Sequence, residues 1–148
     1  MPKPQKQDFT QLFRQIQVMF SRYYANILGK RDLTLPQYTL LSVLLQGGPM
    51  PMSEAGSKLH ISKPAVTHLT DQLERKKYLT RQAHPHDRRV ITLKILPKGE
   101  RKAKETQSDI LKIMLKVLDH FNEDEQKTIT SFYQHLFRSV ENLLGGEP

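Results

Sequence analysis

The stretch from Ser62 to Lys76 combines small polar side chains with a base, at spacings that suit contact with a nucleic acid. Thr67 and His68 offer hydrogen-bonding groups near its start, and Arg75 offers a positive charge near its end. In a helix whose first turns enter a groove, such groups could meet base edges and phosphates. An ordinary amphipathic surface helix would carry the same side chains, so the flanking segments must decide between the two interpretations.

The apolar positions of this stretch predict a helix with one buried stripe. Val66, Leu69 and Leu73 recur at i, i+3 and i+7, which is the spacing of one helical face. Ser62 is a suitable N-cap, and a proline in the first turn is tolerated because its missing N–H has no partner there in any helix. The polar face opposite the stripe carries Pro64, Thr67, His68, Asp71 and Arg75.

Two further helices are predicted upstream. Thr34 and Gln37 have the spacing of a capping box, in which the threonine caps a helix and the glutamine lies at its third position. Ser53 is predicted to cap a short helix that ends near His60. A short helix, a tight turn and a second helix with one polar face together indicate a helix-turn-helix.

Two segments after the helix-turn-helix, Tyr78–Ala83 and Val90–Leu96, alternate apolar and polar residues as strands do. The loop between them, His84–Arg89, is polar and basic. A two-stranded ribbon in this place is a wing, and an arginine at its tip can enter the minor groove, where the negative potential is strongest. We therefore expect a mainly α fold of the α+β type, a winged helix-turn-helix.

Long apolar stripes lie at both ends of the chain. The segment 8–28 and two helices after residue 97 have apolar residues at helical spacing. These faces exceed what one small core can absorb, so we predict a helical dimer interface built from both termini. In this interpretation residues 8–32 and 98–145 form a dimerisation region, and residues 33–97 form the DNA-binding domain.

The charge balance favours a polyanionic partner such as double-stranded DNA. The 148 residues include 23 Lys and Arg against 15 Asp and Glu, a net charge of +8, and neutralising phosphates supplies most nucleic-acid affinity. The absence of cysteine excludes disulfides and thiolate metal sites. Because no apolar run reaches membrane-spanning length and residues 1–7 lack the apolar region of a signal peptide, we expect a cytoplasmic protein with no membrane partner.

The order of these elements and their residues resemble the MarR family of bacterial winged-helix regulators. The resemblance is strongest between residues 33 and 100. It rests on Leu33-Thr34-Leu35-Pro36-Gln37-Tyr38, Ile61-Ser62-Lys63-Pro64-Ala65-Val66-Thr67, Leu73-Glu74-Arg75-Lys76 and Asp87-Arg88-Arg89. It implies a homodimer on a pseudo-palindromic operator, usually a repressor, and often release by a small aromatic or anionic effector.

The resemblance also implies a role for individual residues. The side chains that would face the major groove are Ser62, Lys63, Pro64, Ala65, Thr67 and His68. Ser53 and Arg75 would lie near phosphates. In the wing, Arg89 would reach the minor groove and be held by Asp87, while Arg88 would contact the DNA backbone.

The chain departs from the pattern of that family at several positions, among them Ala55-Gly56 in place of Leu-Ala and Leu96 in place of a threonine cap. His68 stands where arginine is common, and imidazole is shorter and mostly neutral at pH 7, which weakens a phosphate or guanine contact. Lys77 stands where a glycine commonly ends the recognition helix, and a left-handed lysine would cost about 1 kcal/mol. These departures suggest a divergent member with its own operator rather than a different fold.

Other functions are compatible with parts of the sequence. His84 and His86 could bind Zn²⁺ or Ni²⁺ in a metal-responsive regulator, although two histidines fall short of the usual four ligands. A non-regulatory module that binds RNA or a protein is disfavoured, because Tyr78 is the only aromatic residue between 39 and 120. An enzyme is also disfavoured, since phosphate-loop, nucleophile-elbow and H-E-x-x-H motifs are absent, and no cofactor is expected.

An effector pocket is expected where the terminal helices meet the winged domain. The candidate lining residues are Phe13, Met19, Tyr23, Tyr24, Tyr38 and Met114. Each of them could instead be a core residue. The tyrosines, together with Arg22, Lys30 and Arg31, favour an aromatic acid as the ligand.

Overall fold

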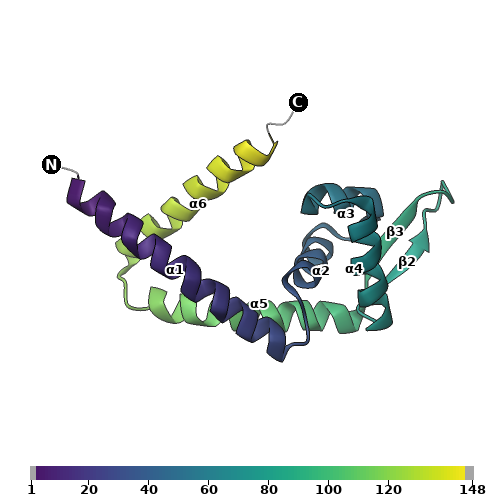
Figure 1. The fold of residues 1–148 in the computed structure, drawn as a ribbon, viewed down its shortest axis with the longest axis horizontal. Coiled ribbons are helices and arrows are strands. Elements are labelled where there is room, and N and C mark those ends of the chain that lie inside the picture. The colour runs from purple at the N-terminus through teal and green to yellow at the C-terminus, as the bar shows by residue number, and fades with distance from the viewer. Residues whose placement is uncertain (1–2, 146–148) are drawn as a thin grey trace. The chain divides into compact units, whose positions relative to one another are not determined.

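The computed structural model describes the backbone of residues 3–145 and the side chains of residues 6–145. Its elements are α1 (Lys3–Lys30), α2 (Leu35–Gly47), β1 (Met50–Pro51), α3 (Met52–Leu59), α4 (Lys63–Arg75), β2 (Leu79–Ala83), β3 (Ile91–Ile95), α5 (Pro97–Leu118) and α6 (Glu123–Gly145), as Figure 1 shows. The chain forms two compact units, which divide after Ile110 within α5. The prediction of a mainly helical fold with a small sheet is confirmed.

The predicted capping box at the start of α2 is present. Thr34 Oγ1 accepts a hydrogen bond from the Gln37 backbone N–H (3.3 Å), and Gln37 Oε1 accepts one from the Thr34 N–H (3.1 Å). At the other end Gly48 has φ of 73° and donates its N–H to the Leu44 carbonyl (3.0 Å). The positive φ at this position favours glycine, and the helix ends here.

The start of α3 differs from the prediction. The helix begins at Met52, and the cap position is held by Pro51, which makes no side-chain capping bond. Ser53 is therefore not the N-cap and lies exposed in the first turn. The reason is that Pro51, with φ of −58°, leads directly from strand β1 into the helix, so no separate capping residue stands between them.

Gly56 brings α3 close to α4. A Cβ atom at this position would lie 2.9 Å from Val66 Cγ2, which is closer than packed carbons approach. The absence of a side chain at Gly56 therefore permits the short separation between the two helices and compensates for the roughly 1 kcal/mol that a glycine costs inside a helix. The turn between these helices passes through His60, whose φ of 51° is left-handed.

Within residues 3–145 the sheet has three strands rather than the two predicted. Its order is β1-β3-β2, and both pairs are antiparallel. The register of the wing follows the predicted alternation, with Leu79 opposite Ile95 and Arg81 opposite Leu93. The added strand is only Met50–Pro51, too short to show a period of two in the sequence.

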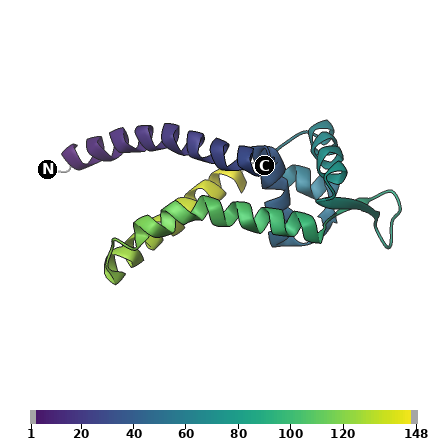
Figure 2. The same ribbon diagram turned by 90° about the horizontal axis from the view of Figure 1, so that it is seen from below.

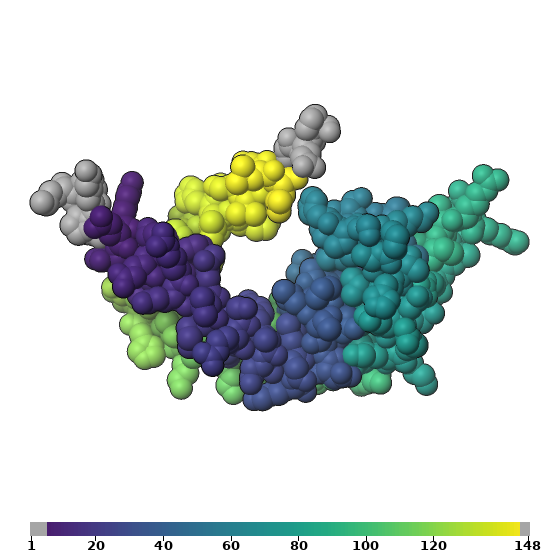
Figure 3. All heavy atoms as spheres, viewed as in Figure 1, coloured from purple at the N-terminus to yellow at the C-terminus, as the bar shows by residue number. Residues whose placement is uncertain are grey.

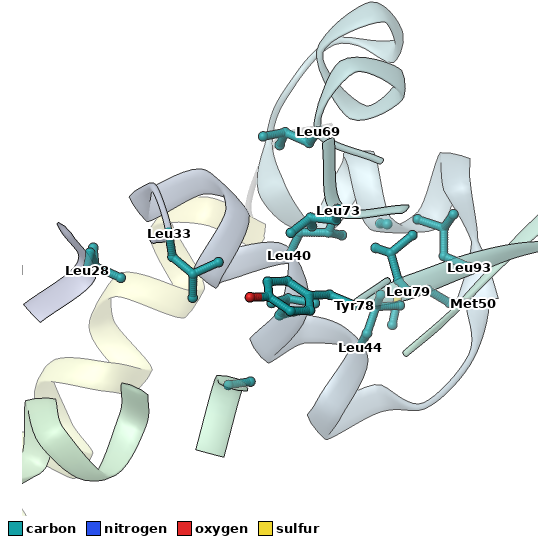
Figure 4. Packing of buried hydrophobic residues seen from close by; sticks show 13 residues of the cluster. Leu28, Leu33, Leu40, Leu44, Met50, Leu69, Leu73, Tyr78, Leu79 and Leu93 are labelled. Atoms are coloured by element: carbon teal, nitrogen blue, oxygen red, sulfur yellow. The ribbon is translucent and has the colours of Figure 1, made fainter. Parts of the chain in front are cut away.

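One apolar core holds these elements together in the first unit. Figure 4 shows leucines from α2, α4, β2 and β3 converging around Tyr78 and Met50. The fully buried leucines are Leu40, Leu41, Leu44, Leu73, Leu79 and Leu93. Each such side chain contributes about 1.5–3 kcal/mol when it leaves water, and together they fix α4 against the wing.

The helices at the two ends of the chain leave much apolar surface exposed. α1 begins at Lys3 rather than near residue 8, because polar helix formers such as Lys6 and Gln7 extend it. In the second unit, Asn122 Oδ1 caps α6 by accepting the N–H of Glu125 (3.1 Å), as its type and position predict. The described part of α6 has no buried residue at all.

Candidate nucleic-acid interface

The start of α4 is capped and its polar face is exposed. Ser62 Oγ accepts the Ala65 N–H (3.3 Å), which confirms Ser62 as the N-cap. The predicted groove-facing residues Lys63, Pro64, Thr67 and His68 are exposed, and Ala65 is partly exposed. The exposed Thr67 side chain donates its hydroxyl to the Lys63 carbonyl (3.0 Å), which leaves its oxygen lone pairs for a partner. Such an acceptor suits an adenine amino group, and the methyl group of threonine suits a thymine methyl.

The wing loop presents two exposed arginines, Arg88 and Arg89. Asp87 Oδ1 accepts the backbone N–H of Arg89 (2.9 Å), and the Asp87 carbonyl accepts the N–H of Val90 (3.0 Å). Asp87 therefore orders the turn through the backbone and leaves both guanidinium groups for a partner. Figures 1 and 2 show the hairpin projecting beyond the helices of its unit, and Figure 3 shows its side chains standing clear of them.

Arg81, a residue that the sequence interpretation did not single out, joins the wing to α4. Its guanidinium lies 2.6 Å from Asp71 Oδ1 and 3.3 Å from Glu74 Oε1, and its backbone N–H donates to Glu74 Oε2 (3.0 Å). The single positive charge of Arg81 offsets half of the charge of these two carboxylates, which would otherwise repel phosphates beside the recognition helix. The signal available in the sequence was Asp71 and Glu74 at i, i+3 on one helical face.

The end of α4 carries a further set of basic groups. Arg75 is exposed, and its Nε donates to the Asp71 carbonyl (3.2 Å). Lys76 pairs with Asp32 (Nζ to Oδ2, 3.1 Å), which ties the turn after α4 to the end of α1. Lys77 has φ of 60°, so the left-handed lysine expected from the sequence is present, with its cost of about 1 kcal/mol.

Comparison with known proteins identifies the group to which this architecture belongs. The model of the MarR family matches residues 33–91. The HTH-type transcriptional regulator YcgE of Bacillus subtilis is 30% identical over 125 residues, which cover 82% of this chain and 79% of YcgE. The chain belongs to the MarR family. The HTH-type transcriptional repressor MdtR of Bacillus subtilis is 28% identical over 129 residues, 85% of this chain and 83% of MdtR.

Solved structures of the MarR family share the fold. A MarR family protein from Bacillus stearothermophilus superposes with a TM-score of 0.81 over 95% of this chain and 98% of that one, at 24% identity. The family of the chain is one of transcriptional regulators, which implies DNA binding.

The residues predicted to line an effector pocket in this MarR-family chain differ in burial and in their contacts. Phe13 and Met19 are 50% and 61% exposed on α1. Tyr24 and Tyr38 pack against the core, and the Tyr23 hydroxyl donates to the Asp109 carbonyl (2.8 Å). The sixth candidate, Met114, belongs to the second unit and is partly exposed. The pocket itself stays a prediction.

Arg31, one of the bases thought to attract an anionic effector, already has two carboxylate partners. Its guanidinium lies 2.6 Å from Asp109 Oδ2 and 2.8 Å from Glu105 Oε2 on α5. The hydrogen bond to Asp109 raises the pKa of Arg31, with attraction from both carboxylates adding to the effect. An effector carboxylate would therefore have to compete with Asp109 and Glu105 for this base.

The two wing histidines approach each other without forming a larger cluster. The rings of His84 and His86 are 5.9 Å apart, and His84 Nδ1 accepts the backbone N–H of His86 (3.2 Å). Among the residues that the structure describes, no three His, Cys, Asp or Glu side chains are grouped so that they could hold a metal ion. Within the same residues, no helix is long and apolar enough to cross a membrane.

Proposed function

We propose that this protein is a sequence-specific repressor that binds double-stranded DNA as a homodimer on a pseudo-palindromic operator. The observation that carries the proposal is the exposed polar face of the first half of α4, together with a wing loop that has two exposed arginines. A helix of this kind fits the major groove, and the loop is suited to the adjacent minor groove. The similarity to the repressor MdtR, which extends over most of its length, favours repression rather than activation.

The proposed contacts divide by the part of the DNA that each residue meets. The residues proposed to face the major groove are Ser62, Lys63, Pro64, Ala65, Thr67 and His68. Ser53 and Arg75 contact phosphates, which position the helix without reading sequence. Arg89 enters the minor groove from a turn that Asp87 orders, and Arg88 contacts the backbone.

The homodimer in this proposal is built from both ends of the chain. Residues 8–32 and 98–145 supply its interface, and residues 33–97 supply the DNA-binding domain. The support is the large apolar side chains that these helices leave exposed, among them Phe9, Phe13 and Phe137, because extended apolar faces on a protein surface commonly mark an interface. Two-fold symmetry then spaces the half-sites about ten base pairs apart on one side of the duplex.

Selection of binding sites from random duplex DNA tests the proposal directly. A mutant of MepR from Staphylococcus aureus, solved bound to an oligodeoxyribonucleotide, shares this fold with a TM-score of 0.68 and 20% identity over 89% of this chain and 97% of that one. We expect the selected sequences to contain two inverted half-sites about one helical turn apart. Recovery of unrelated sequences without a repeated half-site would contradict the proposal.

Replacing Arg89 with alanine is expected to weaken binding to operator and non-operator duplexes alike. Losing one cationic contact should make the slope of log affinity against log salt shallower by about 0.9 per protomer. Arg14→Ala is the control, since it removes the same charge from the exposed polar face of α1. If Arg89→Ala and Arg14→Ala gave the same affinity and the same salt slope in fluorescence anisotropy, the wing would not contact DNA.

We further propose that a small aromatic or anionic compound releases the protein from its operator. NadR, solved in complex with 4-hydroxyphenylacetate, shares the fold with a TM-score of 0.67 and 17% identity, over 84% of this chain and 88% of that one. Tyr23 and Tyr24 on α1 and Tyr38 on α2 are suited to an aromatic ring. Calorimetry with a panel of aromatic carboxylates and phenols should give binding heat, and the same compound should lower operator affinity. A panel without heat or effect on affinity would contradict the effector.

A further inference from the structure

A chain of four hydrogen-bonded groups runs from the start of α2 to the exposed face of α4. It begins at the capping box, where the Thr34 backbone N–H donates to Gln37 Oε1 (3.1 Å). A backbone N–H can only donate, so the oxygen of the Gln37 amide must face Thr34. The orientation of that amide, which is ambiguous in isolation, is therefore set by the main chain.

The orientation of the Gln37 amide in turn sets the orientation of the Gln72 amide. Gln37 Nε2 donates to Gln72 Oε1 (2.8 Å), and Gln37 is only 4% exposed, so water has little access to it. With its oxygen turned to Gln37, the Gln72 amide points its NH₂ group at His68 Nε2, which lies 2.9 Å away. An NH₂ group is a donor, so His68 Nε2 must accept.

The position of the proton on His68 follows. A neutral imidazole carries one proton, and when Nε2 accepts, that proton lies on Nδ1. Asp71, the carboxylate three residues further along this helix, is paired with Arg81 at 2.6 Å. His68 is exposed on the face of α4 that lies opposite the buried stripe. The ring therefore presents an N–H donor through Nδ1.

We infer that His68 is a specificity-determining residue that donates Nδ1–H to a base acceptor in the major groove, with its tautomer selected by Gln72. This inference rests on the proposed function. The acceptors available there are guanine N7 and O6, adenine N7 and thymine O4, whereas cytosine presents an amino donor. The contact therefore discriminates against cytosine at the base that His68 meets. A histidine in place of an arginine makes one directional contact rather than a charged one.

Gln72→Glu is the decisive variant because it reverses the tautomer while keeping the chain of contacts. A carboxylate still accepts from Gln37 Nε2, but it has no proton to offer, so His68 must donate from Nε2, and in the neutral ring Nδ1 then becomes the acceptor. Long-range ¹⁵N–¹H spectra of the free protein at about pH 8.5, where imidazoles are in general neutral, report which nitrogen is protonated. We expect Nδ1–H in the wild type and Nε2–H in Gln72→Glu.

The matching change in DNA recognition is measured with a set of duplexes that vary one base at a time. We expect the wild type to prefer an acceptor over cytosine at one position in each half-site by about 5- to 10-fold, and Gln72→Glu to shift that preference toward cytosine by a similar factor. Gln82→Glu on the exposed wing strand is the control. It adds the same charge without touching His68, so it should lower affinity for all duplexes equally.

Two outcomes would overturn the inference about His68 and leave the proposed function standing. One is an Nε2–H tautomer in the wild-type spectrum, which needs no DNA at all. The other is a wild type that selects a sequence while Gln72→Glu keeps identical base preferences. A wild type that selects no sequence would instead overturn the proposed function, and the tautomer result would still stand as a property of the free protein.

Discussion

Replacing Gly99 with alanine is expected to destabilise the protein by about 3 kcal/mol or more. A Cβ atom at Gly99 would lie 2.0 Å from the Tyr78 carbonyl oxygen and 2.8 Å from the Tyr78 Cα. Both sides of this contact are backbone, so no flexible side chain can move aside. The Tyr78 carbonyl is further held by the N–H of Leu96 (2.9 Å). Relief would require α5 to separate from the start of β2.

Denaturant unfolding followed by circular dichroism measures this effect, and Gly29→Ala is the matched control. Gly29 lies within α1 with nothing within 4 Å of an added Cβ. The same substitution there should stabilise the protein by about 0.5–1 kcal/mol, because alanine is the better helix former. A Gly99→Ala protein as stable as the wild type would mean that the close approach of α5 to Tyr78 is not maintained in solution.

Replacing Leu136 with aspartate is expected to convert the proposed dimer into a monomer and to lower operator affinity by about 100-fold or more. Leu136 is 44% exposed in the single chain and lies among the exposed apolar residues of α6. In a two-fold interface the substitution places two unpaired carboxylates in an apolar surface, each at a cost of several kcal/mol. A monomer also holds only one recognition helix, so it loses the second half-site.

Sedimentation velocity and fluorescence anisotropy read out the two effects separately. Ser131→Asp is the control, because Ser131 lies on the opposite, polar face of the same helix and is exposed. It introduces the same charge and should leave both the mass and the affinity unchanged. Should Leu136→Asp sediment as a dimer and bind the operator normally, α6 would not form the interface.

Much of the first unit could be predicted from short-range patterns. The capping box at Thr34 and the N-cap at Ser62 each depend on groups within three residues of one another. The stripe Val66, Leu69 and Leu73 is buried as its period requires. The strand register of the wing follows from its alternation and its loop length. Helix caps, apolar stripes and hairpins depend on residues that are close together in the chain, so they can be predicted from the sequence.

Apart from the short strand β1, the sequence by itself determined the kinds of elements, their order and the polar face of α4. Only the tertiary structure decided how that face is supported. The contact of Gln37 with Gln72 spans 35 positions, and the contact of Arg31 with Asp109 spans 78. The close approach of Gly99 to Tyr78 is also invisible to any local pattern. These contacts depend on how separate elements pack against one another. No period or spacing of residues along the chain predicts which distant residues will meet.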